Sequence, residues 1–190
     1  FEILTELNIA WQKIEQDPKL DEFIRRLDTE LLQKDINPAQ KLVVFSESKE
    51  TTTHIVKHLK AKGRNDVLEI HSDNRDRLKK TIRDNFDANI PRENYKNDFN
   101  IIIATEVLAE GVNLHRSNVI VNYDTPWNST RLMQRIGRVN RIGSVAPKVY
   151  IFNFYPTAKV NSDIELEKKA IMKLQAFHSA LGEDSEIYSP

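Results

Sequence analysis

Short apolar segments alternate along the chain with segments in which apolar residues recur every three or four positions. The apolar segments lie at 41–45, 67–70, 101–104, 119–122 and 149–154. Short, continuously apolar runs are typical of buried strands, whereas recurrence at three and four residues is typical of a helix that packs one face on a core. We therefore expect helices at about 6–15, 17–32, 48–62, 73–86, 106–110, 129–141 and 163–181.

Residues that favour helix ends stand at the borders of these segments. Asp17-Pro18 combines an N-cap with proline at the first helical position, and Ser46-Glu47-Ser48 supplies the cap of the next helix, which Gly63 ends. Asp73 is the expected cap of the helix at 73–86. Apolar strands that alternate with helices predict an α/β fold, a three-layer sandwich with a mainly parallel central sheet and helices on both faces.

Composition narrows the class of protein. The chain has 190 residues, with 28 Lys and Arg against 28 Asp and Glu, and no cysteine. Zero formal charge argues against a generally basic surface that binds nucleic acid all over. The lack of cysteine fits a reducing compartment, so we expect the protein in the cytoplasm, or in the nucleoid or nucleus, wherever its nucleic acid lies. The apolar runs are far shorter than the roughly 20 residues of a membrane span. We expect one domain at 17–160, a helical extension at 1–16, and a helix with a tail at 161–190.

The segment from Asn128 to Ser144, NSTRLMQRIGRVNRIGS, has an unusual charge pattern. Between residues 125 and 162 there is no Asp or Glu. At about 100° per residue, a helix over 131–141 places Gln134 and four arginines on one stripe, opposite an apolar face. The arginines are Arg131, Arg135, Arg138 and Arg141. Guanidinium does not lose its proton in proteins, so the stripe requires an anion or acidic groups from elsewhere.

Two interpretations of the arginine stripe remain open at this stage. In one, the stripe binds a phosphate, whose oxygens suit the planar fork of arginine. In the other, it is a solvated face that acids from other helices cover.

Further polar residues follow the expected strand at 101–104. Thr105 and Glu106 supply a hydroxyl and a carboxylate, Gly111 lets the backbone approach a ligand, and Asn113 offers both a donor and an acceptor. The alternative is an ordinary helix cap followed by a helix terminator. Because parallel sheets place functional groups at the carboxyl ends of their strands, we expect a site there, built from 46–48, 71–74, 105–113 and 123–141.

Taken together, these segments resemble the second RecA-like domain of superfamily 2 helicases, and most closely the Swi/Snf and RapA-type branch. Residues 41–46 with 51–59 resemble motif IV, and 104–114 (ATEVLAEGVNL) resemble motif V. Residues 121–127 (VNYDTPW) with 134–143 (QRIGRVNRIG) resemble the approach to motif VI and the motif itself. The resemblance covers about 17–154 and implies a RecA-like fold of the type found in P-loop NTPases.

The resemblance also implies roles for particular residues. Arg138 and Arg141 would be the catalytic arginine fingers that reach the phosphates of ATP held by a partner domain. The residues on the nucleotide side would be Gly111, Asn113, Gln134 and Arg135, with Glu110 nearby. The residues that contact the nucleic-acid backbone would be Ser46, Thr105, Ser72 and Arg75.

The sequence lacks two motifs that such an enzyme needs. No G-x-x-x-x-G-K-[ST] loop and no D-E-x-[DH] run is present. We therefore expect ATP and its Mg²⁺ to be held by an N-terminal RecA-like lobe, no metal site here, and negligible ATPase activity from these residues alone. The resemblance favours double-stranded DNA as the nucleic acid.

Two other classes of function are weighed against this enzyme part. One is a helicase-like module that does not hydrolyse ATP and docks an acidic partner through its arginine-rich helix. The other, a flavodoxin-like or receiver domain, is disfavoured because no acidic cluster follows the strand at 41–45.

Overall fold

The computed structural model describes residues 17–105, 112–126 and 128–155, together with residues 3, 5, 6 and 172. The expected helices at 6–15, 106–110 and 163–181 lie outside these three ranges. None of the described helices is long and apolar enough to cross a bilayer.

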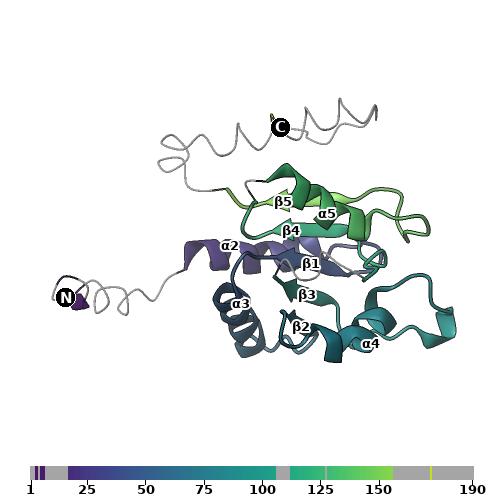
Figure 1. Ribbon diagram of the computed structural model, residues 1–190, viewed down its shortest axis with the longest axis horizontal. Coiled ribbons are helices and arrows are strands. Elements are labelled where there is room, and N and C mark those ends of the chain that lie inside the picture. Colours follow the sequence, from purple (N-terminus) through teal and green to yellow (C-terminus); the bar gives the residue numbers. More distant parts are fainter. Residues whose placement is uncertain are drawn as a thin grey trace.

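A five-stranded parallel sheet forms the centre of the fold, as the alternation of apolar runs predicts. Its strands stand in the order β2-β3-β1-β4-β5, with β5 uppermost in Figure 1. The bounds are β1 Leu42–Phe45, β2 Val67–Ile70, β3 Ile101–Ala104, β4 Val119–Asn122 and β5 Tyr150–Asn153. In register, Phe45 stands level with Ala104 on one side and Asn122 on the other. The loops after these strands therefore meet at one edge of the sheet.

Helices cover both faces of the sheet, so the predicted fold class is confirmed. The helices are α2 Pro18–Arg26, α3 Lys49–Ala61, α4 Arg75–Phe86 and α5 Ser129–Val139. A π-helical segment, Leu27–Leu31, continues α2, and a short 3-10 turn lies at Arg92–Asn94. The α2 and α3 side chains share one apolar core with β1, including Phe23, Leu27 and Ile55. The α4 and α5 side chains share the other, including Ile82, Phe86 and Ile136.

The predicted helix starts are confirmed at α2 and α3 and wrong at α4. Asp17 accepts a hydrogen bond from the Leu20 N–H at 3.0 Å, and Ser48 Oγ accepts one from the Thr51 N–H at 3.0 Å. At α4 the N-cap position is held by Asn74, not by the predicted Asp73. The Asp73 carboxylate pairs with Lys49 instead, which joins the loop after β2 to the start of α3.

The end of α5 also differs from the prediction. The helix stops at Val139, and Asn140 is extended with φ −81° and ψ 91°. Arg141 therefore stands beyond the helix, and its direction is set by the loop that follows.

One lysine lies in the core at the amino ends of the strands. Lys41, which precedes β1, is fully buried. Its Nζ donates to the Phe99 carbonyl at 2.8 Å and stands 4.8 Å from the centre of the Phe86 ring. Burial, together with the nearby Arg116 charge, lowers the pKa of Lys41 to about 8.

This buried lysine makes the folding stability depend on pH. The pKa of Lys41 is about 8 in the folded chain and 10.5 for an ordinary lysine, so between these two pH values the unfolded chain binds more protons than the folded chain. The free energy of unfolding therefore rises with pH in that range. We expect a gain of about 2 kcal/mol in the free energy of unfolding between about pH 7 and pH 9.5. Urea unfolding of the wild type and of Lys41→Met at both pH values measures this gain. An equal pH dependence of the unfolding free energy in the variant would contradict the assignment to Lys41.

Candidate nucleotide and nucleic-acid interfaces at opposite edges of the sheet

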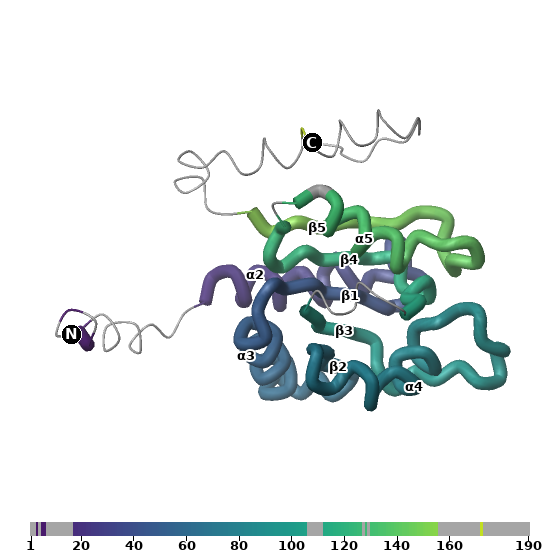
Figure 2. Tube along the Cα trace, in the orientation of Figure 1, coloured from purple at the N-terminus to yellow at the C-terminus, as the bar shows by residue number. Residues whose placement is uncertain are grey.

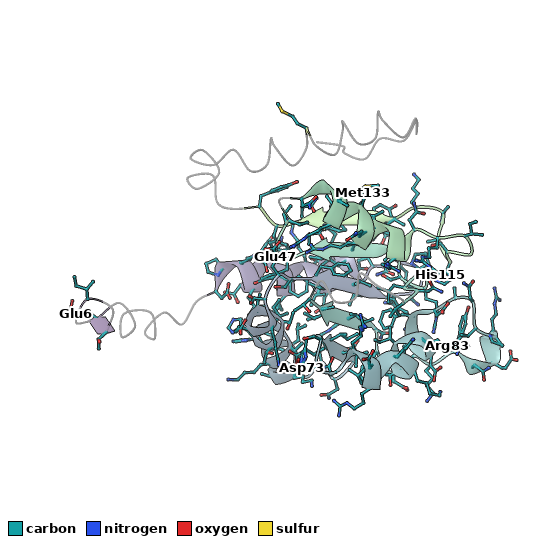
Figure 3. The ribbon with its side chains drawn as sticks, in the orientation of Figure 1. Glu6, Glu47, Asp73, Arg83, His115 and Met133 are labelled. Atoms are coloured by element: carbon teal, nitrogen blue, oxygen red, sulfur yellow. The ribbon has the colours of Figure 1, made fainter. Side chains whose placement is uncertain are left out.

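Helix α5 spans the sheet from one edge to the other. It starts after the carboxyl end of β4, and near its far end the Arg138 carbonyl accepts a hydrogen bond from the Leu114 N–H, in the segment that precedes β4, at 3.0 Å. His115 of that segment lies at the opposite end of the sheet from Glu47 and Asp73 (Figure 3). Arg138 and Arg141 are thus at the amino edge of the strands. The expectation of one arginine stripe at the carboxyl ends is wrong, because a helix of this length carries its last residues across the sheet.

The four arginines of this segment also differ in exposure. Arg131 and Arg141 are exposed, Arg138 is half-buried and Arg135 is fully buried. Arg135 Nη1 donates to Asn122 Oδ1 at 2.7 Å and to the Asp124 carbonyl at 3.2 Å, and its guanidinium stands 5.1 Å from the centre of the Phe45 ring. Arg135 is therefore an anchor of α5 on the carboxyl edge of β1 and β4, whereas Arg131, one turn earlier on the same helix, is exposed.

The Asp124 carboxylate joins three parts of the fold at the carboxyl edge. Its carboxylate accepts from Lys19 Nζ of α2 at 2.8 Å, from Ser46 Oγ at 2.5 Å and from the Glu47 N–H at 3.2 Å. Burial pushes the pKa of Asp124 upward, but the hydrogen bonds from Lys19 and Ser46 outweigh burial and hold it below its ordinary value. Asp124 is thus a carboxylate that ties α2 and the β1 loop to the β4 loop.

The residues predicted to contact nucleic acid gather at this same edge. Thr105 is half-buried after β3, and its N–H donates to the Ile70 carbonyl at 3.2 Å. Ser72 is exposed and donates to Asp73 at 3.0 Å, while Arg75 Nε stands 3.5 Å from Asp76. Ser46 differs from the others because it is fully buried and its hydroxyl is bonded to Asp124.

A second polar cluster lies at the amino edge, around the end of α5. Arg141 Nη1 donates to Asn113 Oδ1, and Arg141 Nε donates to the Gly137 carbonyl at 3.0 Å. Asn113 Nδ2 in turn donates to Asp87 Oδ2 at 3.3 Å. The structure therefore brings together Asn113 and Arg141, which are 28 residues apart in sequence. Of the other residues predicted on the nucleotide side, Gln134 is exposed on α5, and Gly111 and Glu110 lie outside the described residues.

Lys19 and Asp87 are site residues that the sequence analysis did not identify, and Asp124 was included only within the range 123–141, with no role of its own. Asp124 could have been singled out, because it follows the end of an apolar strand closely, as Ser46 and Thr105 do. Asp87 gives no comparable signal, since it only follows the end of a helix. Among the described residues, no three His, Asp or Glu side chains come close enough to hold a metal ion.

Comparison with known families identifies the domain. The family described as "Helicase conserved C-terminal domain" matches residues 22–143. The chain belongs to this family. The match begins within α2 and ends just beyond α5, so it includes all strands except β5 and, apart from Lys19, the residues of both polar clusters described above.

Curated relatives of this helicase domain are several times longer than the chain. It is 37% identical over 93 residues to the uncharacterized ATP-dependent helicase YqhH of Bacillus subtilis, covering 49% of this chain and 16% of the relative. It is 30% identical over 135 residues to the ATP-dependent RNA helicase DBP2 of Candida glabrata, covering 70% of this chain and 22% of the relative. The chain thus spans about a fifth of the relatives it matches.

Solved structures share the fold of the helicase domain. The C-terminal part of the Fun30 ATPase domain matches with a TM-score of 0.60 and 18% identity, over 82% of this chain and 46% of that one. Saccharomyces cerevisiae Dbp5, solved with RNA and ADP BeF3, matches with a TM-score of 0.54 and 22% identity, over 80% of this chain and 36% of that one.

We expect Arg135 and Arg131 to differ sharply in their effect on stability. Arg135→Ala removes a buried donor and leaves the oxygens of Asn122 and Asp124 without it, which should lower the free energy of unfolding by about 2–4 kcal/mol. Arg131→Ala, on the exposed side of the same helix, should change it by less than about 0.5 kcal/mol. Urea unfolding of the two variants tests this, and equal losses would show that Arg135 is not the anchor of α5.

Proposed function

We propose that the chain is the C-terminal lobe of an ATP-dependent nucleic-acid helicase or translocase. In this proposal Arg138 and Arg141 are arginine fingers that act on ATP bound by a Walker-motif lobe of the same protein. The observation that carries it is the placement of both arginines at the amino edge, where exposed Arg141 is hydrogen-bonded to Asn113. Membership of the helicase C-terminal family and the ATP-dependent helicases among the relatives support it.

The chemistry at the amino edge suits a triphosphate. The acceptors of Arg141 among the described residues are the oxygens of Asn113 and Gly137, which are neutral and orient the guanidinium without cancelling its charge. Guanidinium groups that reach the transferring phosphoryl group stabilise the charge that develops on its oxygens. Mg²⁺ and the phosphate cradle are assigned to the other lobe, whose motifs this sequence lacks.

Gly137 adds a separate argument for an approach from outside the domain. Glycine within a helix is about 1 kcal/mol less favourable than alanine. Nothing lies within 4 Å of where a Cβ at Gly137 would stand, and the residue is exposed. The described part of the chain therefore gives no reason for glycine here, whereas the close approach of a nucleotide or of the partner lobe does.

We assign contacts with nucleic acid to the carboxyl edge, through Ser72, Arg75 and Thr105. Such groups contact phosphate and sugar, so binding would be largely independent of base sequence. Ser46 takes part only if its hydroxyl leaves Asp124. The motifs Y-D-x-x-W-N and Q-R-x-G-R-x-x-R favour the Swi/Snf–RapA branch and double-stranded DNA, with a location wherever that DNA lies. Because an RNA helicase is among the relatives, binding to single-stranded RNA should be measured beside binding to the DNA duplex.

The decisive test replaces the two arginines in a protein that carries this domain together with its nucleotide-binding lobe. Arg138→Ala and Arg141→Ala should each lower ATP turnover stimulated by nucleic acid by about 10³-fold, because a finger acts on the transition state. Binding of a DNA duplex should stay within about threefold of wild type, because the nucleic-acid residues lie at the other edge. Arg131→Ala, exposed on the same helix, is the matched control and should leave turnover unchanged.

The alternative, a module that docks an acidic partner without hydrolysis, predicts the opposite result. Turnover unchanged in both finger variants would reject the motor and leave docking as the better explanation.

A further inference from the structure

Three side chains at the amino edge form a continuous hydrogen-bonded series from α4 to Arg141. Asp87 Oδ2 accepts from Asn113 Nδ2 at 3.3 Å, and Asn113 Oδ1 accepts from Arg141 Nη1. The series joins the end of α4, the segment before β4 and the loop after α5. Figure 2 shows that the tube following α4 and the tube following α5 both project at this end of the sheet.

The central amide of this series has a direction. An asparagine side chain has a donor end and an acceptor end, and only its oxygen can accept from a guanidinium. An ionised carboxylate accepts hydrogen bonds and does not donate them. With its NH₂ group on Asp87, Asn113 must therefore turn its oxygen toward Arg141. Without Asp87, nothing in this series prevents the amide from turning its NH₂ group toward the guanidinium, which repels it.

The Asp87 carboxylate is itself held by its own surroundings. Asp87 follows the last residue of α4, and its N–H donates to the Arg83 carbonyl at 3.0 Å. Its Oδ1 accepts from the Asn89 N–H at 2.9 Å and stands 3.7 Å from Nε2 of the fully buried His115. Only 13% of the Asp87 side chain is exposed. The carboxylate is thus part of the rigid end of α4, and not a free surface group.

We propose that Asp87 is the positioning residue that sets the direction of Arg141 through the Asn113 amide. Asp87 touches neither nucleotide nor nucleic acid in this proposal, and it acts only through Asn113. Its effect on turnover rests on the proposed function of Arg141 as a finger. The two bonds from Arg141, Nε to the Gly137 carbonyl and Nη1 to Asn113, fix the orientation of the guanidinium, and among the described residues they leave Nη2 for phosphate oxygens.

The test compares two replacements of Asp87 in the protein that contains both lobes. Asp87→Leu removes the acceptor while keeping the branched shape in a larger side chain, and should lower kcat for ATP about 10- to 100-fold with an equal fall in kcat/KM. Asp87→Asn keeps one acceptor oxygen, which can accept either from Asn113 or from the Asn89 N–H, and should therefore lower kcat clearly less than Asp87→Leu does. Asp84→Leu is the matched control: it removes a carboxylate with the same 13% exposure one turn earlier on α4, where the partner is Lys80, and should leave kcat unchanged.

A double-mutant cycle separates this inference from the proposed function. In an Arg141→Ala background, Asp87→Leu should have no further effect on kcat, because its effect passes through Arg141. The same fold-loss in both backgrounds would overturn the positioning role while leaving the finger intact. If Arg141→Ala alone has no effect, the proposed function has failed. Thermal unfolding of each variant shows whether a loss of kcat comes from a loss of stability. A kcat loss in Asp87→Asn equal to that in Asp87→Leu would also overturn the proposal.

Discussion

The attachment of α5 to the sheet is the constraint on which both edges of the domain depend. Arg135 is buried at the carboxyl edge, where Asn122 and the Asp124 carbonyl accept its hydrogen bonds. From this anchor, Ile136 and Val139 continue along the apolar core. The whole helix, which starts at the carboxyl edge with Ser129, rises roughly 16 Å, enough to carry its last turn across a four-residue strand. The buried Arg135 holds this helix on the sheet, and the end of the helix brings Arg138 and Arg141 to the opposite edge.

Neutral oxygens are a recurring way in which this segment holds its arginines. Arg135 donates to an amide and a backbone carbonyl, and Arg141 does the same with Asn113 and Gly137. A carboxylate in these positions would hold the side chain more strongly but would also cancel much of its charge. The nearby carboxylates contact other groups instead of the arginines. Asp87 accepts a hydrogen bond from the amide of Asn113, and the Asp124 carboxylate is bonded to Lys19 and Ser46. At exposed Arg141 the arrangement combines a defined direction with positive charge that, in the proposed function, is available for phosphate.

The sequence was sufficient for the strands and the fold class, and not for the order of the strands or the position of the arginines. The bounds of β2, β3 and β4 were predicted to the residue, because apolar runs such as 101–104 are flanked by polar residues that mark their ends. The stripe failed because helical periodicity gives the direction of a side chain around an axis, and not the edge of the sheet at which it lies. Helical periodicity also could not show that Arg135 is buried, because a polar residue on the predicted outer face gives no sign of a hydrogen-bond partner inside the protein. The partnership of Asp87 with Asn113 depends on how α4 ends in space, which local pattern does not encode.

The central claim is that Arg138 and Arg141 recognise the charge that develops on ATP during hydrolysis. The most direct measurement is the affinity of a protein with both lobes for ADP–aluminium fluoride, which resembles the transferring phosphoryl group, compared with its affinity for ADP. We expect Arg141→Ala to weaken binding of the analogue by about 100-fold while ADP binding changes by less than about threefold, because only the analogue presents the transition-state charge. Equal weakening for both ligands, or none for either, would contradict it.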